Sequence, residues 1–145
     1  MKLLLGIGNE LLGDDGLGPY LARNFSAPGW RACDCGTALE NFTSLVKHYR
    51  PEKLVLVDAA EMGLPPGEFR RLSLDQVDTI FTSTHTIPIS HLISYLEGYC
   101  GEVILIGVQP KRLELGAELS EEVRRGVGHL LRLLQAEAFE QLTYG

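Results

Sequence analysis

Acidic side chains and one histidine stand at three separated points of the chain where they could act together in catalysis. Asp14 and Asp15 follow an apolar N-terminal segment, Asp58 follows the apolar run Leu54–Val57, and His85 lies between two threonines. Two carboxylates and one imidazole can hold a divalent metal while leaving positions open for water or substrate. Paired carboxylates can instead share a proton and activate water. These residues indicate hydrolytic chemistry or the recognition of a metal ion.

Each of these residues also has an interpretation without catalysis. Asp14 or Asp15 could cap a helix and complement its dipole. Because adjacent side chains cannot both point the same way, we expect one of the two to cap and the other to face the cleft. Asp58 could bind the backbone amides of a loop, and His85 could be a loop histidine bonded to the backbone.

Other polar residues lie near the same positions. Glu10 precedes the aspartate pair, Glu61 follows Asp58, and the hydroxyls of Ser83 and Thr84 could orient His85 through hydrogen bonds. The remaining histidines flank apolar stripes or lie on the polar side of a predicted helix. We therefore expect surface or packing roles for His48, His91 and His129.

Several motifs with a known mechanism are missing from the sequence. It contains no H-E-x-x-H, no Walker loop and no G-x-S-x-G. Gly6-x-Gly8 follows a predicted strand, but Leu11 occupies the third glycine position of a dinucleotide fingerprint. The acid-rich turn that follows would also repel a pyrophosphate. A nucleotide-binding α/β domain is therefore only a third interpretation, which calorimetry with nucleotides would test.

The elements that must position these residues alternate between strands and helices. Apolar and β-branched runs predict strands, and apolar spacing with capping residues predicts helices. The predicted strands are 2–7, 30–35, 53–57, an edge strand 68–72, and 102–108. The predicted helices run from Asp14 or Asp15 to about 25, over 41–49 and 89–96, and onward from Ser120. This order predicts a three-layer α/β domain whose ligand site lies at the carboxyl ends of the strands.

Composition limits the class of protein. The 145 residues are one domain's length, and 45% hydrophobic with 22% charged residues is typical of a globular fold. The formal net charge of −6 argues against a nucleic-acid partner. The short apolar start predicts neither a signal peptide nor a membrane span. An odd, sparse set of cysteines (Cys33, Cys35 and Cys100) predicts reduced thiols in a cytoplasmic protein, with Cys33 and Cys35 as small hydrophobes on one strand face.

Five segments together resemble the nickel–iron hydrogenase maturation endopeptidases. Residues 6–18 (GIGNELLGDDGLG) resemble the opening motif of that family, and residues 56–63 (LVDAAEMG) with 66–67 resemble its second motif. Residues 83–89 (STHTIPI) resemble the third, and 101–110 and 119–120 resemble the remainder. The resemblance covers almost the whole chain in order. The Ser-Thr-His and Val-Gln-Pro variants most resemble the subgroup that serves hydrogenase 3 of formate hydrogenlyase complexes.

The resemblance implies a fold, a substrate and a site. The fold is a three-layer α/β/α sandwich with a twisted, mostly parallel five-stranded sheet, here a single domain over residues 1–145. The activity is removal of a short C-terminal extension from the hydrogenase large-subunit precursor after nickel insertion. The metal-contacting positions of the family correspond to Asp15, Asp58 and His85, whereas Glu10 falls on a variable position. The nickel is recognised in the substrate rather than permanently bound, and we expect a monomer.

Alternatives stay open at this point. The two aspartates and the histidine could check for nickel and place the scissile peptide beside it, or the two aspartates could activate water without a catalytic metal. A non-catalytic metal-sensing chaperone that binds the nickel-loaded precursor is the alternative function. Glycines allow close backbone approach, so we expect the precursor tail to lie near Gly13, Gly16 and Gly18.

Overall fold

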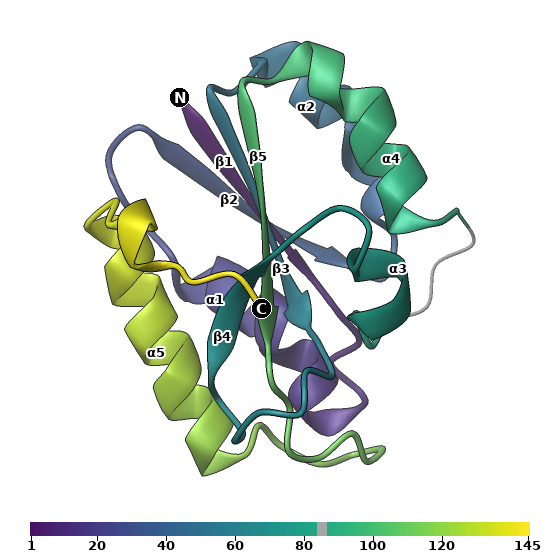
Figure 1. Ribbon diagram of the computed structural model, residues 1–145, viewed down its shortest axis with the longest axis vertical. Coiled ribbons are helices and arrows are strands. Elements are labelled where there is room, and N and C mark those ends of the chain that lie inside the picture. Colours follow the sequence, from purple (N-terminus) through teal and green to yellow (C-terminus); the bar gives the residue numbers. More distant parts are fainter. Residues whose placement is uncertain (84–86) are drawn as a thin grey trace.

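The chain folds around a five-stranded sheet with the strand order β2-β1-β3-β5-β4 (Figure 1). The computed structural model describes residues 1–83 and 87–145. Strands β1, β2, β3 and β5 are parallel, and β4 runs antiparallel to β5 at the edge. The bounds are Lys2–Ile7 for β1, Trp30–Gly36 for β2, Lys53–Ala59 for β3, Phe69–Leu72 for β4 and Glu102–Val108 for β5.

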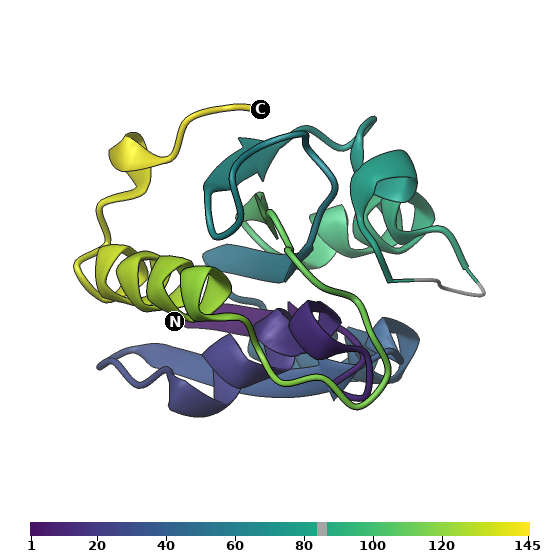
Figure 2. The ribbon, with the colours of Figure 1, turned by 90° about the horizontal axis from the view of Figure 1, so that it is seen from below.

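Helices cover both faces of this sheet, as Figures 1 and 2 show from two sides. Because successive side chains of a strand point to opposite faces, each central strand contributes residues to two hydrophobic cores, one on each face of the sheet. Leu5 and Leu56 pack on the face covered by α2, α3 and α4, whereas Leu4 and Val55 pack on the face covered by α1 and α5. The helices are α1 (Leu17–Asn24), α2 (Thr43–Tyr49), α3 (Val77–Ile80), α4 (Ile89–Leu96) and α5 (Glu121–Gln135).

This architecture confirms the predicted three-layer sandwich with a mostly parallel five-stranded sheet. The one difference that concerns the site is the length of β3, which extends two residues beyond the predicted end at Val57. Asp58 pairs with Gly107 and Ala59 with Val108, because a polar side chain does not interrupt the backbone ladder. Asp58 is therefore held within the sheet rather than in the loop that follows.

The helix boundaries differ more from the prediction than the strands do. The first helix begins as a 3₁₀ turn, Gly13–Gly16, before α1, and the predicted 41–49 helix is α-helical only from Thr43. The four-residue helix α3 was not predicted, because so short a segment carries no period. Helix α5 starts after Ser120 as expected. Over the described ranges, no helix is both long and apolar enough to cross a membrane.

Two glycines set the distance between α1 and the sheet. A Cβ at Gly18 would lie 2.3 Å from the carbonyl oxygen of Ile7 and 2.6 Å from that of Val57. A Cβ at Gly6 would lie 2.0 Å from the carbonyl oxygen of Gly18. The helix backbone thus rests directly on β1 and β3, and the preceding 3₁₀ turn is held at the carboxyl ends of these strands.

Gly13 and Gly16 are packed in the same way. A Cβ at Gly13 would lie 2.6 Å from the carbonyl oxygen of Arg112, and a Cβ at Gly16 would lie 2.9 Å from the Cα of Glu10. Packing within the chain therefore accounts for these glycines and for Gly18. These glycines are therefore no evidence for a bound precursor tail, and the expectation that the tail lies near them stays an untested prediction.

Candidate active site

Asp58 is a fully buried carboxylate at the end of the central strand. Its Oδ1 atom accepts hydrogen bonds from the backbone N–H of Ala59 at 2.8 Å and from the hydroxyl of Ser83 at 3.0 Å. Its Oδ2 atom is buried and has no hydrogen-bond partner among the residues that the structure describes. Burial raises the pKa of Asp58 well above its ordinary value, and the nearby charge of Asp15 adds to this, while the hydrogen bonds from Ser83 and Ala59 oppose it.

Asp15 lies beside this group and is also buried, with an exposed fraction of 4%. Its Oδ2 atom accepts a hydrogen bond from the backbone N–H of Asn9 at 2.9 Å. Its Oδ1 atom accepts a hydrogen bond from the hydroxyl of Thr82, and the hydroxyl of Ser83 lies 3.5 Å from the same oxygen. The backbone after β1 and the segment after α3 thus fix both oxygens of this carboxylate.

The predicted meeting of the loop after β1 with the end of β3 is therefore present. Ser83 is within hydrogen-bond reach of both carboxylates, so Asp15 and Asp58 belong to one cluster. His85, the third predicted site residue, lies outside the described residues. Within the part of the chain that the structure describes, no group of three or more histidine, cysteine or acidic residues is arranged to hold a metal. Among the described residues, Asp15 and Asp58 are the predicted site residues that could contact a metal.

Asp14 precedes Asp15 in the sequence, but its side chain points away from the candidate site. Its Oδ2 atom accepts the backbone N–H groups of Lys111 and Arg112, both at 2.8 Å, and the Ser120 hydroxyl at 2.8 Å. Its Oδ1 atom accepts the N–H of Ser120 at 2.7 Å. The expected division between a capping acid and a site acid is present. The cap, however, serves the loop 111–120 and the start of α5 rather than the helix that follows Asp14.

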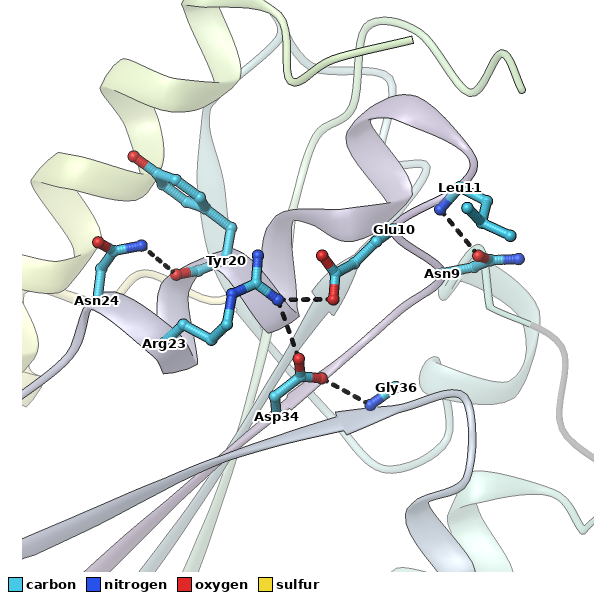
Figure 3. Close-up of polar contacts among 8 residues, drawn as sticks. All are labelled: Asn9, Glu10, Leu11, Tyr20, Arg23, Asn24, Asp34 and Gly36. Carbon is cyan, nitrogen blue, oxygen red and sulfur yellow. Dashed lines mark hydrogen bonds and ion pairs between the residues drawn. The ribbon is translucent and has the colours of Figure 1, made fainter. Parts of the chain in front are cut away.

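Glu10 takes part in a surface ion cluster that Figure 3 shows. Arg23 of α1 donates to Glu10 at 2.6 Å and to Asp34 of β2 at 2.9 Å. The Arg23 and Glu10 side chains are about half exposed, so this cluster contributes little to stability. Its geometry accounts for Glu10 without a catalytic role.

Glu61 is likewise held by a neighbour outside the aspartate cluster. Gln109, buried at the end of β5, donates from Nε2 to Glu61 at 3.0 Å. Its Oε1 atom accepts the backbone N–H groups of Met62 at 2.7 Å and Leu64 at 3.3 Å. Gln109 thus fastens the loop that follows Asp58 to the neighbouring strand.

The other candidates have the structural roles that the sequence predicted. His48, His91 and His129 are all exposed. Cys33 and Cys35 are free and pack against the same core. Burial raises the pKa of the Cys35 thiol, which makes it unreactive.

Sequence reasoning missed the roles of Thr82 and Ser83 toward the two aspartates. Ser83 and Thr84 were expected to orient His85, which stays a prediction because Thr84 and His85 lie outside the described residues. The described hydrogen bonds of Ser83 go to Asp58 and Asp15, which lie 25 and 68 residues earlier in the chain. A cluster of hydroxyls next to a candidate histidine was the only signal. These residues also line a hollow of about 310 Å³ that extends to α3 and to Pro88 and Ile89, which gives a ligand access to this edge of the cluster.

Comparisons with known proteins identify the family of this chain. Residues 17–137 match the family model of hydrogenase maturation proteases. The hydrogenase 3 maturation protease of Escherichia coli K12 is 36% identical over 137 residues, which cover 92% of this chain and 88% of that protein.

Solved structures show the same fold along almost the whole chain. The solution structure of the endopeptidase HycI from Escherichia coli has a TM-score of 0.87 and 32% identity, covering 99% of this chain and 96% of that chain. The crystal structure of HycI from Thermococcus kodakarensis has a TM-score of 0.80 and 30% identity, covering 93% and 90%. The sequence match, the shared fold and the peptidase relatives lead to one conclusion: this chain belongs to the hydrogenase maturation proteases and is a peptidase.

Proposed function

We propose that this peptidase removes the C-terminal extension from a nickel-loaded nickel–iron hydrogenase large-subunit precursor. Family membership supplies the class of substrate. The observation that carries the proposed site is the Oδ2 atom of Asp58, which is buried without a described partner beside Asp15. An unpaired buried carboxylate oxygen costs free energy, so its retention indicates a ligand that occupies it during function.

The nickel ion of the precursor is the ligand that fits this position. We infer that Asp15, Asp58 and, from the sequence motif, His85 contact nickel that the precursor already holds. Carboxylates and an imidazole suit a divalent transition metal, and a precursor without nickel offers them nothing to bind. The contact would also place the scissile peptide beside a Lewis acid that can polarise its carbonyl or a bound water.

The chain's own residues then hold the two carboxylates for this contact. The N–H of Asn9 and the hydroxyl of Thr82 fix Asp15, and the N–H of Ala59 fixes one oxygen of Asp58. The alternative mechanism uses the same two side chains as a pair that shares a proton and activates water. The two mechanisms differ in one requirement, since only the first needs nickel in the precursor.

The test is to process one purified precursor in nickel-loaded and nickel-free forms and to weigh the products by intact-mass spectrometry. We expect loss of a C-terminal fragment only from the nickel-loaded form. Equal cleavage of both forms would favour the carboxylate pair without a metal check. A stable complex with an uncleaved precursor would instead identify a metal-sensing chaperone and overturn the proposed function.

Four finer properties belong to the same proposal. We propose a large subunit of the hydrogenase 3 type as substrate, in keeping with the Escherichia coli relative. We also propose one domain over residues 1–145, a monomer, and action in the cytoplasm, where the three free cysteines stay reduced.

A further inference from the structure

Ser83 has a hydrogen-bonding position that the proposed nickel contact does not use. Its hydroxyl lies 3.0 Å from Oδ1 of Asp58 and 3.5 Å from Oδ1 of Asp15. A hydroxyl carries one hydrogen, so it donates to one carboxylate at a time, and the shorter distance favours Asp58. Thr82 donates to Asp15, so the consecutive hydroxyls of Thr82 and Ser83 each serve a different aspartate.

The consequence for Asp58 is an unequal pair of oxygens. Oδ1 takes both described hydrogen bonds, from the N–H of Ala59 and from Ser83, and Oδ2 takes none. The torsion that turns a carboxylate about its last bond is soft, with a broad range of allowed angles. The backbone N–H groups of Ala59 and Ser83 both act on this carboxylate. Among the described residues, the Ser83 hydroxyl is the one side-chain donor to it, and it adds the contact on Oδ1 that sets which way Oδ2 faces.

We propose that Ser83 is a positioning residue that locks the Asp58 carboxylate so that Oδ2, and not Oδ1, is left free of donors for the ligand. The proposal rests on the proposed function for the identity of that ligand, but the orientation itself is a property of the free protein. In this role Ser83 acts through Asp58, to which its hydroxyl is hydrogen-bonded. Partners that orient the side chains contacting a metal change affinity or activity by about 10- to 100-fold when removed.

The variants Ser83→Ala and Ser83→Thr separate the hydroxyl from the shape of the side chain. Threonine keeps the donor, and the hollow of about 310 Å³ that Ser83 lines gives its extra methyl group room. Ser90→Ala is the matched control. Ser90 lies on α4, further along the same part of the chain, and donates to Asp78 rather than to either site aspartate. The Ser90→Ala variant therefore removes a hydroxyl near the hollow and leaves the hydrogen bonds of Asp58 intact.

The first measurement is steady-state processing of the nickel-loaded precursor. We expect Ser83→Ala to lower kcat by about 10- to 100-fold with KM within about twofold, because the loss falls on the orientation of Asp58 rather than on the binding of the precursor. Ser83→Thr should restore kcat to within a few-fold of wild type, and Ser90→Ala should leave it unchanged. Wild-type kcat in Ser83→Ala, or equal losses in Ser83→Ala and Ser83→Thr, would overturn the proposal.

The second measurement does not depend on the substrate. Crystal structures of the metal-free wild type, Ser83→Ala and Ser83→Thr report the orientation of the Asp58 carboxylate directly. We expect one orientation in the wild type and in Ser83→Thr, and a rotated or split carboxylate in Ser83→Ala. An unchanged orientation in Ser83→Ala would overturn the positioning role. If the wild type failed to cleave any precursor, the proposed function would fall, and these structures would still decide the role of Ser83.

Discussion

Asp14 and Asp15 are consecutive residues whose carboxylates bind opposite parts of the molecule. Asp14 accepts four hydrogen bonds from Lys111, Arg112 and Ser120, whereas Asp15 accepts from Asn9 and Thr82 at the candidate active site. The sequence presents the two as equivalent. The structure places one in a cap of the loop 111–120 and the other at the candidate active site, and the different roles that we propose for them can be tested by comparing the two substitutions.

Asp14→Ala should destabilise the fold. It leaves the N–H groups of Lys111, Arg112 and Ser120 without their acceptor. The buried N–H of Ser120 costs about 1–3 kcal/mol when unpaired, and the N–H groups of the exposed residues Lys111 and Arg112 add less because water can reach them. We expect Tm to fall by roughly 5 °C or more in a thermal melt followed by circular dichroism. A Tm within about 2 °C of wild type would contradict the structural role of Asp14.

Asp15→Asn should give the opposite result. The amide keeps the shape of the carboxylate and one acceptor oxygen, so Tm should stay within a few degrees of wild type. Processing of the nickel-loaded precursor should fall by about 100-fold or more, because a carboxylate in the cluster is lost. Intact-mass spectrometry of the product over time gives the processing rates of the wild type and of Asp15→Asn. Normal processing by Asp15→Asn would remove this residue from the proposed site.

Asp58→Asn should change how stability depends on pH in the chelated, metal-free protein. The folded protein holds the pKa of Asp58 above its ordinary value, mainly through burial. Below the ordinary pKa of about 4, the carboxyl is protonated in both folded and unfolded states and contributes no difference. As pH rises, the unfolded state ionises first, so the wild type loses stability until the pH passes the raised pKa. The amide that replaces the carboxyl in the variant has no proton to lose.

Urea unfolding between pH 3 and pH 8 measures this difference. We expect the free energy of unfolding of Asp58→Asn to rise relative to that of wild type as pH rises above about 4. Glu52→Gln is a control of opposite sign, because hydrogen bonding to Lys2 lowers the pKa of the exposed Glu52. That variant should lose a little stability relative to wild type as pH rises from about 3 to about 5, and the difference should then stay constant. A gap between Asp58→Asn and wild type that stays constant or shrinks would contradict the raised pKa.

Gly18→Ala should separate α1 from the sheet. The new Cβ would lie 2.3 Å from the Ile7 carbonyl oxygen, and a backbone atom cannot move aside as a flexible side chain can. Overpacking of this kind costs about 1–3 kcal/mol or more. Because α1 follows the turn that carries Asp15, processing should fall with stability.

Gly98→Ala is the control for this substitution. A Cβ at Gly98 meets no atom within 4 Å, so stability should change by no more than about 0.5 kcal/mol. Chemical unfolding of both variants at one pH provides the comparison. Equal stability of Gly18→Ala and wild type would show that the helix and sheet tolerate a wider spacing.

The succession of strands and helices, and the residues at the strand ends, follow from local sequence alone. An apolar run such as 53–57 predicts a strand from its own side chains, because burial on both faces needs no information from elsewhere in the chain. Asp58 could be singled out because a carboxylate after such a run must lie at the edge of the sheet. The motif segments, from residues 6–18 to residues 119–120, also carry the resemblance to the family.

The hydrogen-bond partner of each polar group, in contrast, depends on how the whole chain packs. Ser83 and Asp58 are 25 residues apart, Thr82 and Asp15 are 67 apart, and Ser120 and Asp14 are 106 apart. Hydrogen bonds over such separations form only after α1, the sheet and α5 have packed together. The spacing of residues along the chain does not report on that packing. The sequence could therefore identify the aspartates as candidates, but it could not distinguish the role of Asp14 from that of Asp15 or predict the hydrogen bond from Ser83 to Asp58.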